Sequence, residues 1–228
     1  MSSGEALRQL TNAIVKGDAL LTEQAAKDLV ERRSSVAATL DAIIDAINIA
    51  NDLHSIGEYD NSRFSASSSA TLAALKVLEP QLSIEESKAV GTVVLACIPE
   101  DRVGLDSAIS GSVLRAAGLR TLILPTAVKY ENLASIASQN QCDLVVLLVE
   151  TSEDDPRVQS LASELRESLL KNIKVLVGGD SAAKICRKYG FTNCFSDLAD
   201  LVSKATEIVM KERESRLGTD RLGFSRTG

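Results

Sequence analysis

The chain has 228 residues, of which 45% are hydrophobic and 3% aromatic, with no tryptophan. This length allows one large domain or two small ones, and a core of alanine, valine, leucine and isoleucine is typical of packed helices and buried parallel strands. The net charge of −6 argues against nucleic-acid binding as a main role. No apolar run approaches the roughly 18 residues of a membrane span, and the N-terminus lacks a signal-peptide pattern. We therefore expect a cytoplasmic protein with no nucleic-acid and no membrane partner.

The first part of the chain, residues 1–82, is predicted to form a bundle of four helices. Apolar residues recur at spacings of three and four, as at Leu10 and Ile14, and a Gly-Asp pair at 17–18 separates the first two helices. The last helix is expected to span 66–78 and to end before Pro80, because the residue before a proline avoids helical geometry. Four helices with short connections indicate a small bundle.

From residue 90 to residue 211, strands alternate with helices. Short aliphatic runs predict strands at 92–97, 121–124, 144–149, 174–177 and 192–195. Helices are predicted between and after them, at 105–117, 130–138, 158–170, 182–189 and 198–211. This alternation is typical of an α/β fold with a doubly wound parallel sheet, in which ligands bind outside the carboxyl ends of the strands.

Two polar segments delimit the predicted domains. Residues 81–89 form an acidic connector between the helical bundle and the sheet domain. Residues 212–228 are rich in arginine and glycine and predict a flexible polar tail, with a partner-docking peptide as the alternative. The expected organisation is thus a bundle at 1–82, a sheet domain at 90–211 and a C-terminal tail at 212–228.

The cysteines and the histidine limit metal and redox chemistry. The four cysteines show no CxxC spacing and are interpreted as buried free thiols, against a redox or metal role: Cys97, Cys142, Cys186 and Cys194. His54 is the single histidine, so a histidine-rich metal site within one chain is excluded. No nucleophile–histidine–acid set, P-loop or dinucleotide-binding glycine motif supports catalysis by this chain alone.

Several short motifs, in this order and spacing, resemble the corrinoid (cobalamin-binding) proteins of methyltransferase systems. The bundle matches at Ala13 to Asp18 and at Leu53 to Tyr59, where the family has Leu-Phe-x-x-Gly-Glu-Tyr. The sheet domain matches at Ala116-Ala117-Gly118, Val175 to Gly179 and Gly190 to Asp197. The resemblance covers about residues 5–211. It implies a four-helix bundle followed by a Rossmann-like domain of the cobalamin-binding type, a cobalamin or related corrinoid as cofactor, and a corrinoid-dependent methyltransferase subunit as partner. A homodimer is left open.

The residues that differ from the family lie where the cofactor would be. In the family, an Asp-x-His-x-x-Gly loop after the first strand supplies a histidine to cobalt from below. Here the motif is degenerate: Asp101 falls on the aspartate, Val103 on the histidine and Asp106 on the glycine. Valine has no lone pair for cobalt. Leu148 falls on a serine that lines the family's slot for the nucleotide tail. We expect Val103 and Leu148 to fill this slot, because protein interiors leave few voids.

Other residues after the predicted strands remain candidates for binding a cofactor at the carboxyl edge. They are Glu150 and Thr151 after the third strand, and Gly178, Gly179, Asp180 and Ser181 after the fourth. Asp180 or Ser181 also fits the N-cap of the following helix, which is the alternative interpretation. An acidic rim of Asp101, Asp106 and Glu150 suits a cation, an amine or a basic partner better than a phosphate.

Two functions remain open from the sequence. In the first, the chain carries or senses a cobalamin-type cofactor without a histidine below cobalt, and works beside a methyltransferase. In the second, it is a degenerate family member that has lost cobalamin and acts as a regulatory or protein-interaction module. His54 is the one candidate for an upper ligand to the metal, against the interpretation of an ordinary surface histidine.

Overall fold

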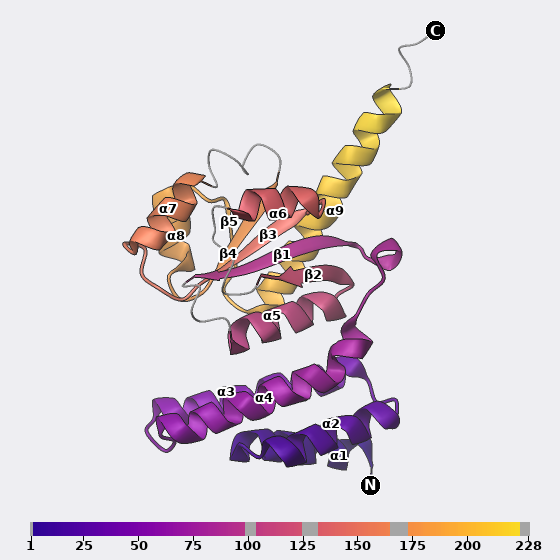
Figure 1. The fold of residues 1–228 in the computed structure, drawn as a ribbon, viewed down its shortest axis with the longest axis vertical. Coiled ribbons are helices and arrows are strands. Elements are labelled where there is room, and N and C mark those ends of the chain that lie inside the picture. The colour runs from indigo at the N-terminus through magenta and orange to yellow at the C-terminus, as the bar shows by residue number, and fades with distance from the viewer. Residues whose placement is uncertain (1, 99–103, 125–131, 165–172, 224–228) are drawn as a thin grey trace. The chain divides into compact units, whose positions relative to one another are not determined.

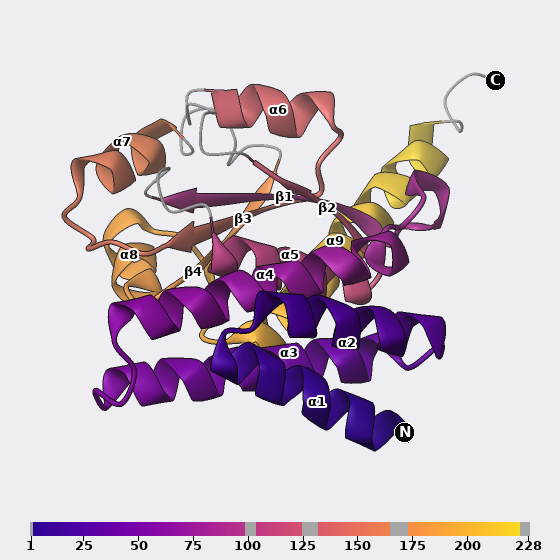
Figure 2. The same cartoon turned by 60° about the horizontal axis from the view of Figure 1, so that its bottom comes forward.

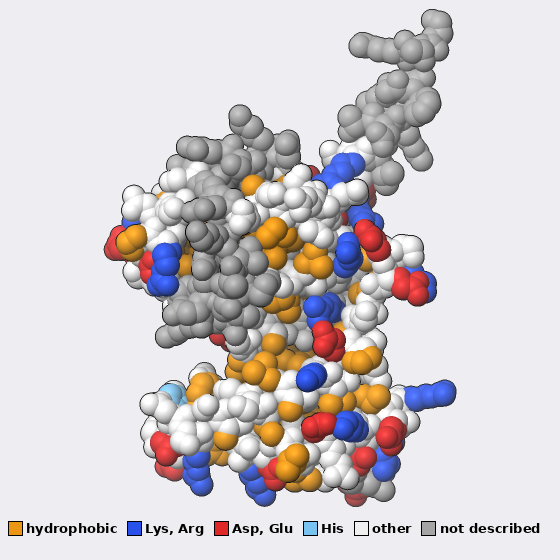
Figure 3. All heavy atoms as spheres, viewed as in Figure 1, with side chains coloured by type: hydrophobic (Ala, Val, Ile, Leu, Met, Phe, Trp, Pro, Cys, Tyr) orange, Lys and Arg blue, Asp and Glu red, His pale blue; other side chains and the backbone are white. Residues whose placement is uncertain are grey.

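The structure, a computed structural model, describes residues 2–98, 104–124, 132–164 and 173–223 of the chain (Figure 1). The chain divides into two compact units, Met1–Ser83 and Ile84–Gly228. Within the described ranges, no helix combines the length and the apolar character needed to cross a bilayer. On the face seen in Figure 3, acidic and basic side chains are interspersed over the surface of each unit.

The first unit is a bundle of four helices, as the sequence predicted (Figure 2). They are α1 (Ser3–Lys16), α2 (Ala19–Glu31), α3 (Val36–Ser55) and α4 (Asn61–Leu82). Each helix begins after a residue whose side chain accepts a backbone N–H of the first turn, namely Ser2, Asp18, Ser35 and Asp60. Helix α1 packs on α2 and α3, and α4 packs on α2 and α3. Their apolar faces enclose Leu10, Ile14, Leu29, Ile43 and Leu78, which are all fully buried.

Helix α4 differs from its prediction at both ends. It begins at Asn61 because the Asp60 carboxylate accepts the N–H of Arg63 at 2.8 Å and so caps the first turn. It also continues through Pro80 to Leu82, so the predicted end before Pro80 is wrong. Proline removes one helical hydrogen bond, but Leu78 and Leu82 are buried on either side of it, with 1% and 2% exposure. Their burial holds the last turn in place.

The second unit is a five-stranded parallel sheet with helices on both faces, as predicted. The short helix η1 (Glu86–Lys88) precedes β1 (Gly91–Ile98), and α5 (Leu105–Ala116) leads to β2 (Leu119–Ile123). Then follow α6 (Leu133–Gln139), β3 (Leu144–Val149), α7 (Pro156–Glu164), β4 (Lys174–Gly178), α8 (Ala182–Tyr189), β5 (Asn193–Cys194) and α9 (Leu198–Gly223). The strand order is β2-β1-β3-β4-β5, and every neighbouring pair is parallel.

The two faces of the sheet are covered by different helices. On one face, alternate residues of β1, β3 and β4 pack with α6, α7 and α8 in one apolar cluster, which contains Val94, Leu147 and Val177. The opposite face is covered by α5 and α9, which contact one another and β1 (Figure 1). Because successive side chains of a strand point to opposite faces, the residue before or after each cluster member faces α5 and α9.

The C-terminal tail that was expected from residue 212 is corrected over 212–223. Helix α9 does not end at Lys211 but runs on to Gly223. Two arginines attach its extension to the sheet: Arg213 Nη1 donates to the carbonyl of Ala89 at 3.2 Å, and Arg216 Nη1 donates to Asp143 at 2.8 Å. Arg213 and Arg216, two of the arginines that suggested a solvated tail, are therefore anchoring residues. Residues 224–228 lie outside the described residues.

Candidate functional site

The candidate site lies at the carboxyl edge of the sheet, where β1, β3 and β4 end. Strand register places Cys97 of β1 beside Leu148 of β3, and Leu148 beside Gly178 of β4. Glu150 follows β3 directly, and its N–H donates to the carbonyl of Ile98 at 2.8 Å. The sequence-based expectation that Glu150 and Gly178 share one edge is confirmed. Asp101 and Val103 lie outside the described residues.

Cys97, Leu148 and Gly178 form a row on the face that α5 and α9 cover. Their strand neighbours Ala96, Leu147 and Val177 belong to the apolar cluster of the other face. The exposure of Cys97 is 4% and that of Leu148 is 5%, so both side chains are buried. We call the region at Leu148 and its register neighbour Gly178 on this face the tail slot, because the resemblance implies that the position of Leu148 lines the nucleotide tail of a corrinoid.

Phe195 fills the tail slot at Gly178. A Cβ atom built on Gly178 would overlap three atoms of the Phe195 ring, Cζ, Cε1 and Cε2. The ring therefore lies directly on the glycine backbone, and the exposure of Phe195 is only 8%. The sequence predicted side chains in the slot at Val103 and Leu148, but not the Phe195 ring. A signal for it was present, since a rare aromatic residue directly follows the last strand while a Gly-Gly pair leaves a hollow.

Gly179 requires glycine for a different reason. Its φ of +106° is rarely adopted by other residues, and a Cβ atom there would overlap the carbonyl oxygen of Val149. The Gly178-Gly179 pair thus allows the end of β4 to approach both Phe195 and the end of β3. Gly179 itself is exposed at the edge of the sheet.

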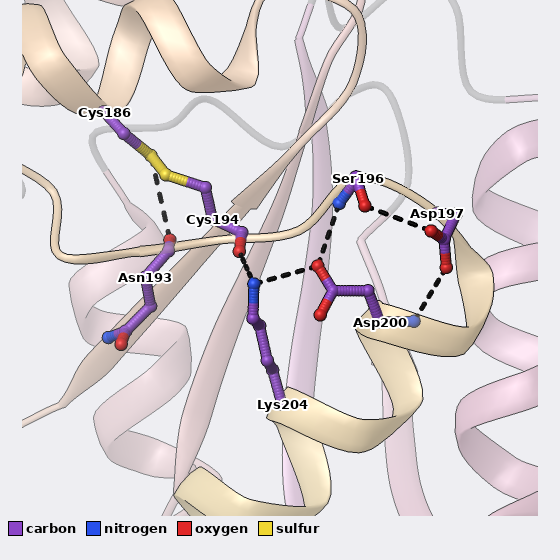
Figure 4. Close-up of polar contacts among 7 residues, drawn as sticks. All are labelled: Cys186, Asn193, Cys194, Ser196, Asp197, Asp200 and Lys204. Atoms are coloured by element: carbon purple, nitrogen blue, oxygen red, sulfur yellow. Dashed lines mark hydrogen bonds and ion pairs between the residues drawn. A yellow bond between two sulfur atoms is a disulfide. The ribbon is translucent and has the colours of Figure 1, made fainter.

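The segment around Phe195 is fixed from both sides (Figure 4). The Phe195 N–H donates to the carbonyl of Val177 at 2.9 Å. Lys204 Nζ donates to the carbonyl of Cys194 at 2.6 Å and to Asp200 at 2.9 Å. The Lys204 ammonium lowers the pKa of the Asp200 carboxyl. Asp200 in turn accepts the N–H of Ser196 at 3.1 Å, so both neighbours of Phe195 are hydrogen-bonded to α9.

Cys186 and Cys194 form a disulfide, with their Cα atoms 6.6 Å apart (Figure 4). The interpretation of these two residues as free thiols is therefore wrong. The turn between α8 and β5 brings together cysteines that are eight residues apart, and such a pairing has no CxxC signature. The bond ties the segment before Phe195 to α8. Cys97 and Cys142 are buried free thiols, as expected.

Cys97 is the one titratable group in the row beside the tail slot. Burial raises the pKa of its thiol to about 12, and the Glu150 carboxylate adds to the rise, while a hydrogen bond with Ser107 opposes it. The thiol is therefore protonated at neutral pH. The Ser107 hydroxyl donates to the carbonyl of Gly104 at 3.0 Å.

Of the predicted acidic rim, Asp101 lies outside the described residues. Asp106 is exposed in the first turn of α5 and Glu150 is half-buried. In the ranges that the structure describes, no group of three or more His, Cys, Asp or Glu side chains is arranged to hold a metal ion. The suggestion of a cation at this rim gains no geometric support from these residues.

Thr151 and Ser181 take part in the starts of two helices. The Thr151 hydroxyl donates to Asp155 at 2.9 Å, and the other Asp155 oxygen accepts the N–H of Arg157 in the first turn of α7. Ser181 occupies the N-cap of α8 but makes no capping bond with its side chain. Its carbonyl instead accepts the N–H groups of Lys184 and Ile185. Ser181 is thus an N-cap by position, and Asp180 next to it stays exposed.

His54 is held within the helical bundle. Its Nε2 lies 2.9 Å from Oδ1 of Asn61, and its ring stacks on Phe64 with centroids 4.8 Å apart. These contacts join the end of α3 to the start of α4. A role for His54 as an upper ligand stays a prediction.

The described residues fit one part of a corrinoid and not another. A nucleotide tail inserted beside Gly178 does not fit, because the Phe195 ring and the buried Leu148 side chain take up the slot. At the edge itself Asp106, Gly179 and Asp180 are exposed, whereas Ile98 and Val149 at the ends of β1 and β3 are buried. A flat ring would therefore rest on these exposed residues and not on the strand ends.

Comparisons with known proteins identify the relatives of this chain. No family model matches it. A corrinoid protein of Desulfitobacterium hafniense (strain Y51) is 23% identical over 184 residues, which cover 78% of this chain and 85% of that protein. The monomethylamine corrinoid protein of Methanosarcina barkeri has the same fold, with a TM-score of 0.71 and 20% identity over 91% of this chain and 100% of that one.

Two more solved structures share the fold at lower similarity. A cobalamin-binding protein from Desulfitobacterium hafniense DCB-2 has a TM-score of 0.51 and 18% identity, over 89% of this chain and 98% of that one. A chain of the methanol:cobalamin methyltransferase complex of Methanosarcina barkeri has a TM-score of 0.50 and 17% identity, over 93% and 84%. This chain is therefore similar in sequence to a corrinoid protein and shares the fold of corrinoid and cobalamin-binding proteins.

Proposed function

We propose that this protein binds a corrinoid in a methyltransferase system and holds or senses the cofactor without a protein histidine below cobalt. The observation that carries the proposal is the shared architecture. A four-helix bundle followed by a five-stranded parallel sheet matches the monomethylamine corrinoid protein over 91% of this chain. Gly178 and Gly179, at the carboxyl edge where ligands of such sheets bind, support it.

The lower side of the cobalt is the part of the proposal that departs from the family pattern. Val103 takes the position of the histidine and offers no lone pair. The only histidine of the chain, His54, is engaged by Asn61 and Phe64 in the bundle. Nitrogen ligation from below would therefore come from the corrinoid's own nucleotide base, and otherwise the position would hold water or stay empty.

The proposed partner is a corrinoid-dependent methyltransferase subunit. One relative in fold comes from a methanol:cobalamin methyltransferase complex. In the described residues, neither a cluster of metal-binding side chains nor a nucleophile with a partnering histidine provides a catalytic centre. We therefore assign the chemical step to the partner and the holding of the cofactor to this chain.

The direct test is co-elution of colour with protein. The purified protein is incubated with hydroxocobalamin and desalted, and its visible spectrum is recorded against a Glu214→Ala variant as a surface control. We expect corrinoid absorbance in the protein fraction of both. If the fractions stay colourless at saturating cofactor, the proposal is wrong, and the interpretation as a degenerate, cofactor-free module takes its place.

A second measurement addresses the lower ligand. In a Val103→His variant that binds cobalamin, we expect the cobalt(III) spectrum to shift toward a form ligated by the new nitrogen. The shift requires the nucleotide base to leave cobalt. An unchanged spectrum in a variant that demonstrably binds would count against position 103 as the place of the lower ligand.

A further inference from the structure

The contact between Phe195 and Gly178 bears on which corrinoids this protein accepts. Three atoms on the outer edge of the phenyl ring lie where a side chain of residue 178 would start. The ring is 8% exposed and thus part of the packed interior rather than a surface group. Because interiors have few voids larger than a water molecule, the slot has no room for a second planar group beside this ring.

In the part of the chain that the structure describes, the walls of the tail slot also offer little polar surface to a nucleotide base. Leu148 is next to Gly178 in the register, and the protonated Cys97 thiol follows on β1. The Ser107 hydroxyl near Cys97 already donates to the carbonyl of Gly104. A base pushed into this row would lose its hydrogen bonds to water without replacement, which is unfavourable.

The backbone of Phe195 is held in place from both sides. Its N–H is bonded to Val177 in β4, and the residue before it is joined by the disulfide to α8. Lys204 and Asp200 of α9 hold the backbone of Cys194 and Ser196. Moving the Phe195 backbone away from β4 would require several of these contacts to break at once.

We propose that this protein recognises the corrin ring and leaves the nucleotide tail outside the sheet, with Phe195 as the residue that sets this specificity. Its ligands are then corrinoids in which the tail is absent, as in cobinamide, or remains folded back onto cobalt. The inference rests on the proposed function, since it concerns the same edge and the same class of cofactor.

The test compares two corrinoids that differ by the nucleotide tail. Equilibrium binding of hydroxocobalamin and of aquocobinamide is measured for the wild type, Phe195→Ala and Phe191→Ala. Phe191 is the matched control, because it is equally buried at 8% but belongs to the apolar cluster on the opposite face. We expect the wild type and Phe191→Ala to bind both corrinoids with dissociation constants within about threefold, whereas Phe195→Ala should favour cobalamin by about tenfold or more.

A spectroscopic readout reports the nucleotide directly. In the electron paramagnetic resonance spectrum of bound cob(II)alamin, nitrogen hyperfine splitting shows that the base is still on cobalt, since position 103 supplies no nitrogen. We expect this splitting in the wild type and its loss in Phe195→Ala. Circular dichroism checks that the variant is folded, and Phe195→Leu, which stays apolar but shorter, serves if the alanine variant is not.

The outcomes separate the two proposals. If the wild type prefers cobalamin over cobinamide by about tenfold or more, the protein binds the tail and the inference is wrong. If the wild type lacks the nitrogen splitting, the tail is not folded back onto cobalt and the inference is wrong as well. If neither corrinoid binds, the proposed function itself fails. Equal binding of both corrinoids with the splitting retained supports the inference even without a variant.

Discussion

Asp143 and Arg216 form an ion pair of 2.8 Å between the amino edge of the sheet and the extension of α9. The Asp143 carboxylate is 2% exposed, and its other oxygen accepts the N–H of Thr92 at 2.8 Å and lies 3.6 Å from Arg213 Nε. Asp143 directly precedes β3, so this pair lies at the edge opposite to the candidate site. It stabilises α9, the helix that also supplies Asp200 and Lys204 to the Phe195 segment.

Removing the extension should therefore destabilise the protein. Truncation after Lys211 takes away Arg213 and Arg216 and leaves a buried carboxylate without its cations. We expect a loss of about 2 kcal/mol in the free energy of unfolding, below the value for a fully buried pair because both arginines are half-exposed. Urea denaturation measures it, with Arg213→Ala/Arg216→Ala as the side-chain equivalent and Glu214→Ala as the exposed control. An unchanged midpoint after truncation would restore the interpretation as a flexible tail.

Opening the tail slot from β3 should also lower stability. Leu148→Ser replaces a 5%-exposed aliphatic side chain with a smaller polar one. We expect the unfolding free energy to fall by about 3 kcal/mol, from lost burial, a cavity and a buried hydroxyl. The control is Leu20→Ser, at a residue with 82% exposure, which should change stability by less than about 0.5 kcal/mol. Equal melting temperatures for the two variants would show that Leu148 is not packed.

The same Leu148→Ser variant bears on retention of the cofactor. The added room and hydroxyl should let it hold cobalamin through desalting better than the wild type does. The gain should be largest in combination with Phe195→Ala, since that ring is the other occupant of the slot. Absorbance per protein in the desalted fractions measures retention, and Leu20→Ser again serves as the control.

Thiol counting should distinguish the two kinds of cysteine. Burial raises the pKa of both Cys97 and Cys142 to about 12, so their thiolates form only as the pH approaches that value. Iodoacetamide at neutral pH should leave both unmodified in the native protein. Without reductant, denaturation should expose two reactive thiols, and reduction should expose all four. Peptide mapping by mass spectrometry assigns them; alkylation of Cys186 or Cys194 without reductant would contradict the disulfide.

The stability that Asp155 contributes should depend on pH in one direction. The Arg157 side chain and its N–H hold the pKa of the Asp155 carboxyl well below its usual range. A carboxyl group whose pKa is lower in the folded state stabilises the protein fully at pH values above its pKa in the unfolded state. This stabilisation is lost as the pH falls through the pKa of the folded state. Asp155→Asn keeps a side chain that can cap the helix but removes the charge that pairs with Arg157, so it should cost less than about 1 kcal/mol between roughly pH 5 and 8, and progressively less below about pH 4.

The control for that measurement is Asp154→Asn. Asp154 pairs with Lys188 at 2.8 Å, but its side chain is 81% exposed, so its effect should be smaller and sensitive to salt. Unfolding midpoints of both variants and the wild type across the pH range provide the comparison. If the difference in unfolding midpoint between Asp155→Asn and the wild type grew toward acid pH, the expected direction of the pH dependence would be wrong.

The spacing of apolar residues along the sequence was enough to predict the helices and strands and their order. Helical spacing at Leu10 and Ile14 and the Gly-Asp turn at 17–18 placed the first helices, because these signals act within a few residues. The run Leu144–Val149 was recognisable as a buried strand for the same reason. Glu150 and Gly178 could be assigned to one edge because parallel strands align their carboxyl ends.

The tertiary structure alone decided what occupies the candidate site and what holds it. Phe195 lies on Gly178, 17 positions earlier in the chain, Cys186 bonds to Cys194, and Arg216 reaches Asp143 across 73 residues. None of these pairs has a local spacing that marks it, since each depends on how separate elements pack. Local sequence determines which helix or strand a residue joins. Packing and ion pairing, in contrast, involve residues from different elements. Only the folded chain therefore shows that an aromatic ring fills the hollow left by a glycine.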